Sequence, residues 1–573
     1  MLSKRILIVG GVAAGASAAV KARRTDEHAE IIVFERGPHA SFANCGLPYY
    51  LGGMIPEREQ LLVVTADRLR RRYGLDIRLA HEVTAVDRKA RTVAVRKAGS
   101  GETYTEAYDK LILATGSRPV RPSLPGVDLP GVFTLTTVED AVAARAFAQE
   151  HEARFGVVLG GGYIGLESVE ALAALGLRTA LLERLDQVLP VLSPEMSAMI
   201  VDHLRDNEVR VHLGAEAEAL IGEDRVRGIR LRGGEEVPAD LVIVAAGVRP
   251  ELDLARRAGL EIEDGIVVDE RMRTNDPDIY AAGDVVQSRR LPDGAQARVP
   301  LAGPANKQGR VAGANAAGGN LRFAGVAGAS VVKVFDLTAG QVGVGEEAAR
   351  RAGLEPLISY THASHHATYY PGAETMAIKL IADRGRGRLL GAEIVGGAGV
   401  DKRLDVLATA IYAGLSVEDL EQLDLSYAPP YSSAKDPVVV AGMVAANLYR
   451  REFASLTPHE LRAILAKSER LQLVDVRTPR EYGAGHIPGA VNLPLDDLRA
   501  RLGELDPACP TVVYCGIGYR SYHAVKILAA RGFKDVRNLS GGMSTWRWVG
   551  EVETGAGPGI TARAGGNAAR APR

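Results

Sequence analysis

Short apolar runs alternate with helix-like stretches from the first residues to about residue 325. The runs are three to five residues long and consist mainly of Val, Ile, Leu and Ala, which is typical of buried parallel strands. We expect strands at 6–9, 31–34, 111–114, 157–159, 179–182 and 241–245. Alternation of this kind predicts βαβ units and parallel sheets, and so an α/β fold.

The pattern changes in the second half of the chain. From 326 to about 451, β-rich runs at 330–335 and 375–382 are mixed with helix-like runs. Residues 452–458 read as a linker, and Thr457-Pro458 predicts a helix that opens at His459. A compact α/β segment follows to about 549, in which a strand at 511–514 precedes a helix from Tyr522. The Gly-, Ala- and Arg-rich tail at 551–573 has little to bury, so we expect it to be disordered.

Composition narrows the class of protein. Lys plus Arg (69) nearly balance Asp plus Glu (70), which favours neither nucleic acid nor an anionic membrane as partner. Three cysteines in 573 residues suit a reducing compartment and form no disulfide framework. The charged start and uncharged stretch to Val20 resemble a signal peptide, but a strand, a glycine turn and an alanine-rich helix account for it better. No apolar run is long enough to span a membrane, so we expect a cytoplasmic protein. We also expect no metal site.

The first strand leads into a glycine-rich turn before the alanine-rich helix. This turn departs from Gly-x-Gly-x-x-Gly because Val12 occupies the middle glycine position. Glu35 ends the next strand, 20 residues after Gly15. There an acid hydrogen-bonds ribose hydroxyls while the helix N-terminus holds a pyrophosphate. The candidate dinucleotide-binding residues are Gly10, Val12, Ala13, Ala14, Gly15 and Glu35.

A second turn keeps the complete pattern and again joins a strand to a helix. Glu183, at the end of the following strand, favours NADH because a carboxylate accepts a 2′-hydroxyl and repels a 2′-phosphate. Arg184 could instead bind the phosphate of NADPH, so both cofactors stay open. The candidate residues are Gly160, Gly162, Tyr163, Ile164, Gly165 and Glu183.

Residues 274–284, T-N-D-P-D-I-Y-A-A-G-D, resemble the second flavin-contacting motif of flavoproteins with two dinucleotide-binding domains. In those proteins the final Asp binds the ribitol, and A-T-G and A-A-G segments like 114–116 and 245–247 mark the crossovers between domains. The resemblance implies FAD in a domain formed by 1–113 and 245–325, and NAD(P)H in a domain at 114–244. It adds the candidate residues Thr115, Gly116, Gly247, Gly283 and Asp284.

Cys45 lies in the segment S-F-A-N-C-G-L-P-Y-Y at 41–50. Dithiol flavoprotein reductases carry a Cys-x4-Cys pair near this point, but position 50 is Tyr and the next Cys is Cys509. A lone thiolate can still accept electrons from a reduced flavin. Its oxidised form is then a mixed disulfide or a sulfenic acid.

Residues 1–450 resemble the coenzyme A disulfide reductases, single-cysteine members of the pyridine nucleotide–disulfide oxidoreductase superfamily. The segment around Cys45, both glycine turns, L-A-G-P-A-N-K-Q-G at 301–309 and Y-A-P-P-Y-S at 427–432 carry the resemblance. It implies a mixed disulfide between Cys45 and coenzyme A, a dimerisation domain at 326–451, and a homodimer in which partner tyrosines reach the site. Tyr427 is the stronger match, and the choice between Tyr369 and Tyr370 stays open. The implied substrate contacts are Ser17, Lys21, Arg24, Ser41, Asn44, Asn306 and Lys435.

Residues 459–549 resemble a rhodanese domain. The segments L-V-D-V-R at 473–477, G-H-I-P-G-A at 485–490, C-G-I-G-Y-R-S at 515–521 and G-G-M-S-T-W at 541–546 match its motifs. Cys515 is the implied persulfide carrier, assisted by the charge of Arg520 and by loop N–H groups. We expect Asp475, Arg477 and His486 to hold the scaffold, and Cys509 to be inert.

The resemblances suggest an FAD-dependent NAD(P)H reductase of coenzyme A disulfide or persulfide. Cys515 would pass sulfane sulfur to coenzyme A, and Cys45 would attack the resulting persulfide. One alternative is an NADH oxidase or peroxidase that cycles Cys45 through sulfenic acid, although Ala13 and Ala14 stand where those enzymes typically carry a His. Another is a sulfurtransferase with a redox-sensing flavoprotein module.

Overall fold

The computed structural model describes residues 3–467 and 470–555. The chain divides into two compact units, Met1–Ala339 and Gly340–Arg573. Disorder was expected from 551, but Glu553 exchanges backbone hydrogen bonds with His486, and the Gly555 N–H donates to the Gly483 carbonyl. Residues 551–555 are therefore attached to the last domain, and the rest of the predicted tail lies outside the described residues.

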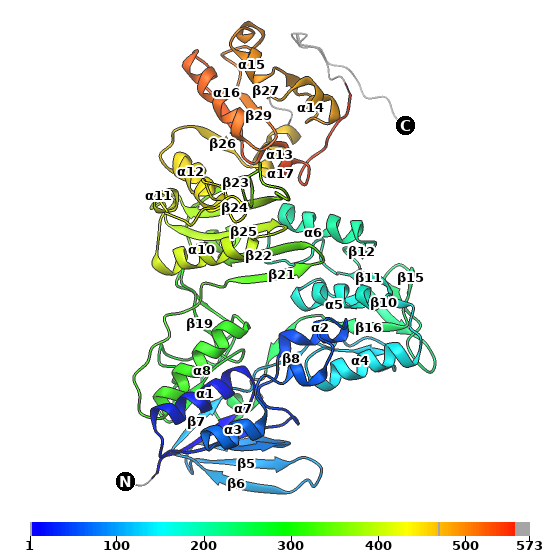
Figure 1. Ribbon diagram of the computed structural model, residues 1–573, viewed down its shortest axis with the longest axis vertical. Helices are drawn as coiled ribbons and strands as arrows, with labels where there is room; N and C mark the ends of the chain where they lie inside the picture. The colour runs from blue at the N-terminus through cyan, green and yellow to red at the C-terminus, as the bar shows by residue number, and fades with distance from the viewer. Residues whose placement is uncertain (1–2, 468–469, 556–573) are drawn as a thin grey trace. The chain divides into compact units, whose positions relative to one another are not determined.

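The first unit begins with a parallel sheet in the order β18-β7-β1-β2-β3, in which β1, β2 and β7 correspond to predicted strands, whereas β3 and β18 were not predicted. Its strands are β1 (Arg5–Val9), β2 (Glu30–Glu35), β3 (Asp76–Leu79), β7 (Lys110–Leu113) and β18 (Ile279–Ala281). Helices α1 (Ala13–Thr25), α3 (Ala66–Tyr73) and α8 (Ala302–Ala316) lie on one face (Figure 1), and their apolar side chains pack in the core of that face. The other face packs against α7 (Asp253–Arg257) and the antiparallel strands β4 (His81–Asp87), β5 (Thr92–Lys97) and β6 (Thr103–Ala107).

Helices α1 and α8 pack side by side with their backbones in close approach (Figure 1). A Cβ atom at Gly309 would lie 2.2 Å from the Ala14 carbonyl oxygen, and one at Gly313 would lie 2.1 Å from that of Ala18. Only glycine fits at these two positions. The helix after the first glycine turn is thus held against a segment almost 300 residues later in the chain.

A second five-stranded sheet has the order β12-β11-β10-β16-β9. Its strands are β9 (Val132–Phe133), β10 (Phe155–Leu159), β11 (Arg178–Leu182), β12 (Arg210–His212) and β16 (Leu241–Val244). Beside it lie α4 (Val138–Glu150), α5 (Tyr163–Ala174), α6 (Pro194–Asp206) and the small sheet of β13 (Ala217–Ile221), β14 (Gly228–Leu231) and β15 (Glu236–Pro238). The connections into and out of this part pair as β8 (Ser117–Pro119) and β17 (Val248–Pro250).

Three short elements in the first unit contain or follow Cys45. These are η1 (Asn44–Gly46), α2 (Leu47–Leu51) and η2 (Arg58–Leu61). A two-stranded ladder of β19 (Ser288–Arg289) and β20 (Gln296–Ala297) precedes α8. Strands β21 (Ser330–Val334) and β22 (Leu337–Gly343) lie at the boundary between the two units.

The second unit contains a long antiparallel ladder and a separate parallel sheet. Strand β24 (Thr375–Asp383) pairs with β23 (Pro356–Ser364) on one side and β25 (Leu389–Gly396) on the other. The helices of this part are α9 (Glu346–Arg351), α10 (Val400–Ala413), α11 (Val417–Glu421) and α12 (Pro437–Tyr449). The mixed α+β composition expected for this region is confirmed.

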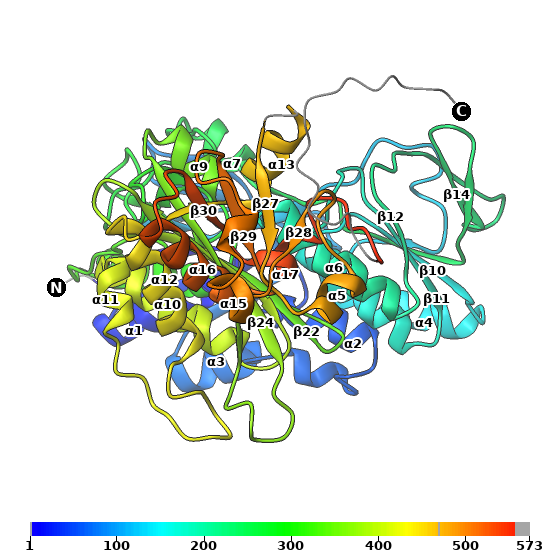
Figure 2. The same ribbon diagram turned by 90° about the horizontal axis from the view of Figure 1, so that it is seen from above.

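The last domain is a parallel sheet in the order β26-β30-β29-β27-β28. The strands are β26 (Ala454–Leu456), β27 (Gln472–Asp475), β28 (Val491–Asn492), β29 (Thr511–Tyr514) and β30 (Val536–Leu539). Figure 2 shows α13 (Pro458–Ala466) on one side and α15 (Leu495–Leu498) and α16 (Tyr519–Ala530) on the other, and the two apolar clusters of the domain divide in the same way. Its remaining helices are α14 (Pro479–Ala484), η3 (Leu502–Glu504) and α17 (Gly542–Trp546).

Two predicted helix starts need correction. Helix α16 begins at Tyr519, three residues before the expected Tyr522, because Gly518 has a φ of +93° and ends the preceding loop. Arg520 and Ser521 are therefore in the first helical turn, not in the loop. Helix α13 begins at Pro458, one residue earlier than expected, behind a capping box of Thr457 and Glu460.

Candidate active site

Both predicted ribose-binding acids also hold their own glycine turns. The Glu35 carboxylate accepts the Gly11 N–H at 2.8 Å and the N–H two residues after itself at 2.8 Å. The Glu183 carboxylate repeats this arrangement, accepting the Gly161 N–H at 2.6 Å and the N–H two residues after itself at 2.7 Å. These hydrogen bonds fix each glycine turn relative to the end of the next strand. The sequence motifs did not predict this second role of the two acids.

The glycine turns are shaped by close backbone contacts and leave an open space. A Cβ atom at Gly10 would lie 2.1 Å from the Ala114 carbonyl oxygen, and one at Gly160 would lie 2.4 Å from that of Ala245. Both glycines have positive φ values, +99° and +107°. By contrast, a Cβ at Gly162 would meet nothing within 4 Å. The open position is where a pyrophosphate approaches the backbone in this type of turn.

The helices that follow the two turns begin without a side-chain cap. Neither Val12, before α1, nor Gly162, before α5, makes a side-chain hydrogen bond to the first helical turn. The first N–H groups of an α-helix have no partner within the helix, and together with the helix dipole they attract an anion. The residues present therefore fit two bound dinucleotides. Tyr163, at the start of α5, has its hydroxyl 2.5 Å from the Ser330 hydroxyl.

Asp284, predicted to contact the flavin, follows β18 close to the first turn. Burial raises the pKa of its carboxyl group, and a hydrogen bond from the Ser117 hydroxyl at 2.9 Å opposes that rise. The N–H of Gly283 donates to the Gln308 side chain at 2.9 Å, which ties this motif to α8. Ser117 and Gln308 were not predicted, since neither lies in a recognisable motif around residue 284.

The predicted crossover glycines lie where β8 and β17 begin. Gly116 and Gly247 have φ values of +68° and +100°, and a Cβ at either would meet nothing within 4 Å. The hydroxyl of Thr115 donates to the Glu251 carbonyl at 2.9 Å, so the two connecting segments are hydrogen-bonded to each other.

Cys45 lies in η1 and is exposed. Partial enclosure by the protein raises the pKa of its thiol, and the carboxylates of Glu167 and Asp284 raise it further. Glu167 is on α5, two residues after the last glycine of the second turn, whereas Asp284 belongs to the flavin-like motif. The thiol is thus placed where the two nucleotide cradles meet.

Glu167 and Tyr49 are site residues that the sequence analysis missed. The Tyr49 hydroxyl donates to Glu167 Oε1 at 3.2 Å. Burial raises the pKa of Glu167 to about 7, although the hydrogen bond from Tyr49 partly opposes this. Burial and the same carboxylate raise the pKa of the Tyr49 phenol. The available signals were the position of Glu167 just after the second turn and that of Tyr49 one helical turn after Cys45.

Tyr50 fills the position where dithiol reductases have their second cysteine. Its side chain is buried, and the Arg145 guanidinium lies 5.0 Å from its ring centroid. Arg145 also donates to the Tyr50 carbonyl at 3.3 Å. The packed aromatic ring leaves Cys45 as the lone thiol of this region.

Three of the implied substrate contacts share one face of α1. Ser17, Lys21 and Arg24 are separated by four and three positions, which places them on neighbouring turns. The Ser17 hydroxyl donates to the Asn306 side chain on α8 at 2.5 Å. Arg24 extends over the Tyr73 ring, and its contact with the phenol lowers the pKa of Tyr73.

The remaining implied contacts lie in three places. The Ser41 N–H donates to the Gly11 carbonyl at 2.9 Å, so this residue is fixed against the first turn. Asn44 is exposed beside Cys45. Lys435 is exposed in the second unit.

Two of the three candidate tyrosines touch each other in the second unit. The hydroxyls of Tyr369 and Tyr427 are 2.8 Å apart; Tyr369 is largely exposed and Tyr427 about half exposed. Their hydrogen bond raises the pKa of Tyr369. Tyr370 instead packs its ring edge-on against His366, with a centroid distance of 5.4 Å.

A buried arginine joins the two segments that carry these tyrosines. Arg403, on α10, is 1% exposed. It donates to the His365 carbonyl at 2.7 Å, to the Asp436 carboxylate at 2.7 Å and to the Ser432 hydroxyl at 3.2 Å. Burial alone would raise the pKa of Asp436, but the hydrogen bonds from Arg403 and Ser432 outweigh it and keep that pKa low.

Cys515 directly follows β29 and is only 1% exposed. Its Sγ accepts the Gly518 N–H at 3.2 Å and the Ser521 hydroxyl at 3.5 Å. The carbonyls of Cys515 and Gly516 accept the first N–H groups of α17, from Met543 and Ser544, each at 2.8 Å. The backbone on both sides of the sulfur is therefore held by hydrogen bonds.

Arg520 pairs with a carboxylate as well as contacting the thiol. Its Nη1 and Nη2 atoms lie 2.9 Å and 2.5 Å from the two oxygens of Glu481, which lowers the pKa of Glu481 to about 2. Arg520 also interacts with Cys515, and that interaction contributes to the rise in the pKa of the guanidinium. Glu481 was missed in the sequence, although it completes a Thr-x-x-Glu capping box with Thr478.

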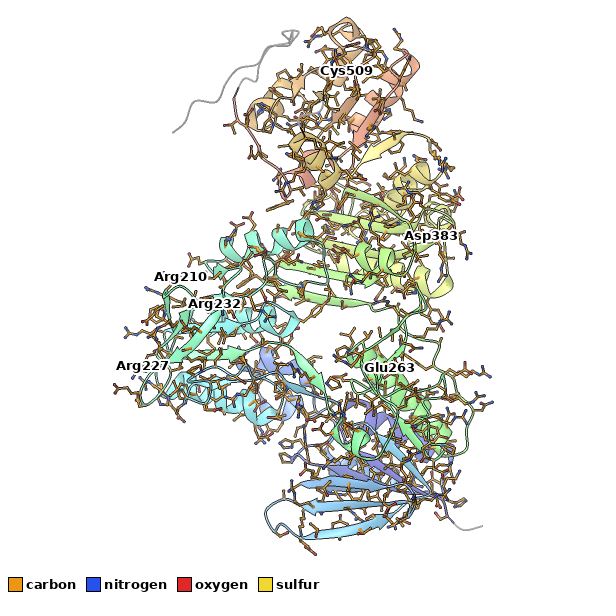
Figure 3. The ribbon with its side chains drawn as sticks, turned by 180° about the vertical axis from the view of Figure 1, so that it is seen from behind. Arg210, Arg227, Arg232, Glu263, Asp383 and Cys509 are labelled. Atoms are coloured by element: carbon orange, nitrogen blue, oxygen red, sulfur yellow. The ribbon has the colours of Figure 1, made fainter. Side chains whose placement is uncertain are left out.

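The residues expected to hold the scaffold are buried inside this domain. Asp475 accepts from Arg477 at 2.6 Å, and Arg477 also donates to the Gly485 carbonyl at 2.6 Å. The His486 ring stacks on Tyr482 at a centroid distance of 3.9 Å. Cys509 is buried just before β29 (Figure 3), and its N–H donates to the Asp506 carbonyl at 3.1 Å.

Three known families match successive parts of the chain. Residues 4–309 match the pyridine nucleotide-disulphide oxidoreductase family, 329–438 match the dimerisation domain of that family, and 457–547 match the rhodanese-like domain. The chain belongs to the pyridine nucleotide-disulphide oxidoreductases and carries a rhodanese-like domain after the dimerisation domain.

Individual relatives are similar to most of this chain. A coenzyme A disulfide reductase of Staphylococcus haemolyticus is 35% identical over 448 residues, covering 78% of this chain and 100% of that protein. The crystal structure of reduced Bacillus anthracis CoADR-RHD is 41% identical with a TM-score of 0.92, covering 96% of this chain and 98% of that one. An NAD-dependent persulfide reductase from A. fulgidus is 39% identical with a TM-score of 0.87, covering 95% and 100%.

No helix within residues 3–467 and 470–555 combines the length and the apolar character that crossing a membrane requires.

Proposed function

We propose that the protein is an FAD-dependent NAD(P)H oxidoreductase that reduces coenzyme A disulfide and coenzyme A persulfide through Cys45, with Cys515 as a sulfur carrier. The observation that carries the proposal is the position of the lone Cys45 thiol. It is close enough to Asp284 of the flavin-like motif and to Glu167 behind the second glycine turn for both carboxylates to raise its pKa. The relatives that act on coenzyme A disulfide and on persulfides support this reading.

The residues around the first turn, with Thr115, Gly283 and Asp284, would hold FAD. Those around the second turn, with Glu183, would hold the nicotinamide cofactor. When bound, the flavin would accept a hydride from NAD(P)H and supply two electrons to the sulfur centre. The chain itself supplies the open glycine at position 162, the uncapped helix starts and the carboxylates that fix both turns.

Cys45 would attack one sulfur of the substrate as a thiolate. With coenzyme A disulfide, a bond forms between Cys45 Sγ and one substrate sulfur while the substrate S–S bond breaks and releases one coenzyme A thiolate. Two electrons then cleave the mixed disulfide, giving the second coenzyme A thiolate and restoring Cys45. Ser17, Lys21, Arg24, Ser41, Asn44, Asn306 and Lys435 are proposed to bind the coenzyme A.

The leaving thiolate needs a proton, and the phenols of the second unit are suited to donate it. The contact between the Tyr369 and Tyr427 hydroxyls favours Tyr369 over Tyr370 as the companion of Tyr427. We propose a homodimer in which these phenols, with Lys435, serve the Cys45 of the partner subunit. The match to a dimerisation domain supports that arrangement.

Cys515 would carry sulfane sulfur to coenzyme A, which makes the persulfide that Cys45 attacks. The hydrogen bonds from Gly518 and Ser521, and the contact with Arg520, would stabilise the negative charge of both thiolate and persulfide. The three cysteines are free thiols, which suits a reducing compartment such as the cytoplasm.

The test is anaerobic NADH oxidation by the purified holoenzyme with coenzyme A persulfide, coenzyme A disulfide and peroxide as separate acceptors. We expect rapid turnover with both coenzyme A substrates and little with peroxide. Turnover with peroxide alone would replace this proposal by a sulfenic acid cycle at Cys45. Steady sulfur transfer without any NADH consumption would leave a sulfurtransferase with a non-catalytic flavoprotein half.

A further inference from the structure

The segment that holds Cys515 contains one charged side chain, and its charge is already balanced. From Cys515 to Arg520 the sequence is C-G-I-G-Y-R, so Arg520, in the first turn of α16, is the only charged side chain of this segment. Both terminal nitrogens of its guanidinium lie within 2.9 Å of Glu481 oxygens. Arg520 and Glu481 together carry no net charge.

Glu481 is fixed in this pair. The N–H of Thr478 donates to its carboxylate at 3.0 Å, and the Thr478 hydroxyl donates to it at 2.8 Å. These bonds form the capping box of α14, so the carboxylate cannot turn away without uncapping that helix. Once Cys515 is ionised, the side chains of this centre carry a net charge of minus one.

The side chains that the loop before Arg520 presents to solvent are apolar or neutral. Ile517 is 45% exposed and Tyr519 is 66% exposed, and they flank Gly518, whose N–H donates to the sulfur. The Tyr519 ring packs edge-on against His523 at a centroid distance of 4.9 Å. A molecule that approaches Cys515 therefore meets the sec-butyl group of Ile517 and the phenol of Tyr519 beside the buried sulfur.

We propose that the sulfur donor to Cys515 is the persulfide of a small organic thiol and not thiosulfate. This inference rests on the proposed function in one respect, that Cys515 is the sulfur carrier. The Cys515 thiolate attacks the terminal sulfur of R–S–SH, a new bond forms between Sγ and that sulfur, and the S–S bond of the donor breaks. R–S⁻ leaves with the bonding electron pair while the hydrogen stays on the transferred sulfur. The products are Cys515–S–SH and R–S⁻.

Charge and shape both favour this donor. Thiosulfate carries two negative charges, and a centre with a net negative charge and no unpaired cation in its loop repels it. A persulfide of a neutral thiol carries at most one charge, and its hydrocarbon part can contact Ile517 and Tyr519. Specificity of this kind depends on penalising the wrong substrate as much as on attracting the right one.

The experiment measures sulfur loading of Cys515 in the full-length holoenzyme carrying Cys45→Ser, which prevents the reductase half from consuming the product. Intact mass spectrometry follows the gain of one sulfur atom in a single turnover. The two donors are 2-hydroxyethyl persulfide and thiosulfate, at equal concentration and matched ionic strength. We expect the persulfide to react about 100-fold faster. A Cys45→Ser, Cys515→Ser double variant gives the background of unspecific labelling.

Glu481→Gln provides the matched variant, because glutamine can keep the capping box while removing the negative charge. The unbalanced Arg520 should then raise the thiosulfate rate relative to the persulfide rate by about tenfold. The ratio of the two rates is the readout, so a general loss of folding does not imitate the effect. Comparable rates for both donors in the unchanged loop, or an unchanged ratio in Glu481→Gln, would overturn the proposal.

Failure of this inference and failure of the proposed function are separable. Reduction of coenzyme A disulfide by a Cys515→Ser variant tests Cys45 alone, whereas the donor ratio in Cys45→Ser tests Cys515 alone. A protein that reduces coenzyme A disulfide but loads Cys515 equally from thiosulfate would contradict only the donor assignment.

Discussion

The two reactive cysteines of this chain have opposite surroundings. Cys45 is exposed, and partial enclosure together with the carboxylates of Glu167 and Asp284 raises the pKa of its thiol. Cys515 is buried and receives hydrogen bonds from Gly518 and Ser521. Hydrogen-bond donors of the chain face the sulfur of Cys515, whereas carboxylates of the chain oppose negative charge at Cys45.

The difference indicates how each thiol is activated. At Cys515 the loop backbone and the first turn of α16 are already arranged around the sulfur, so sulfur transfer needs only a donor. At Cys45 the chain supplies cradles for two dinucleotides, and the reaction depends on what those cradles hold. One centre is complete within its own domain, and the other is completed by cofactors and, as proposed, by a partner subunit.

The largest effect should come from exchanging each cysteine for serine. Cys45→Ser should lower NADH-dependent reduction of coenzyme A disulfide by at least about 1,000-fold, because covalent catalysis is lost. FAD should stay bound, since Cys45 belongs to neither cradle. Cys515→Ser should leave this activity within about twofold, because no step of disulfide reduction uses Cys515.

Steady-state assays of both variants, with flavin absorbance as the check on folding, measure this contrast. Loss of disulfide reduction in Cys515→Ser would mean that the two centres are not independent.

The next effect concerns the phenol that Cys45 is proposed to receive from the partner subunit. Tyr427→Phe should lower the turnover number for coenzyme A disulfide by about 10- to 100-fold, as expected for loss of a general acid. Cys45→Ser and Tyr427→Phe chains, mixed and allowed to exchange subunits, should regain activity. One site of each mixed dimer then has both an intact Cys45 and an intact Tyr427.

Mixing two samples of Cys45→Ser is the control for this experiment and should restore nothing. Absence of complementation after proven subunit exchange would place Tyr427 at the Cys45 site of its own chain and remove the partner from the mechanism.

Much of the Cys515 centre could be predicted from the sequence, because its parts are adjacent in the chain. The segment from Cys515 to Ser521 is continuous in the sequence, and the strand predicted before it, at 511–514, coincides with β29. The helix start was placed three residues late because the decisive feature is the positive φ of Gly518, which a propensity pattern does not reveal. Glu481 was overlooked because it reaches Arg520 from 39 residues earlier in the chain.

The Cys45 centre was harder to predict because distant segments build it. The glycine turns and their acids were visible as motifs. Glu167 was not selected, because its effect on Cys45 depends on how α5 packs beside α2, which no local pattern records. Arg403 is likewise not visible as a sequence motif. This buried cation hydrogen-bonds to two loops that are far apart in the sequence.

Removing the carboxylate beside Cys45 should reduce the contrast between the two thiols. Glu167→Gln should lower the pKa of the Cys45 thiol by up to about one unit, because a nearby negative charge disfavours the thiolate. Since the pKa of Glu167 is about 7, the difference from the unchanged enzyme should grow as pH rises from 6 to 8 and Glu167 ionises.

The pH dependence of Cys45 alkylation by iodoacetamide, located by peptide mass spectrometry, measures this shift. Tyr49→Phe is the matched control, since it removes the hydrogen bond to Glu167 and keeps the carboxylate, and should change the profile much less. A profile for Glu167→Gln that coincides with that of the unchanged enzyme would show that this carboxylate does not set the reactivity of Cys45.

The smallest effect concerns the support of Cys515 by the neighbouring ladder. His362, on β23, lies 2.8 Å from the Thr545 hydroxyl of α17, the helix whose first N–H groups bind the Cys515 and Gly516 carbonyls. Burial and the positive charge of Arg547 lower the pKa of His362 to about 4. The unfolded chain binds a proton near pH 6.5, so stability is lost as pH falls from 6.5 towards 4.

His362 as a whole residue is only partly buried, so we expect this loss to reach only about 2 kcal/mol. His362→Gln should lower the melting temperature slightly at pH 7.5 by weakening the contact with Thr545, yet it should reduce the further drop between pH 7.5 and 4.5 by about 3–6 °C. Sulfur loading of Cys515 should follow the same pH trend, whereas disulfide reduction at Cys45 should not. If acid affects both thiols equally in the two proteins, the Cys515 centre does not depend on its contact with β23.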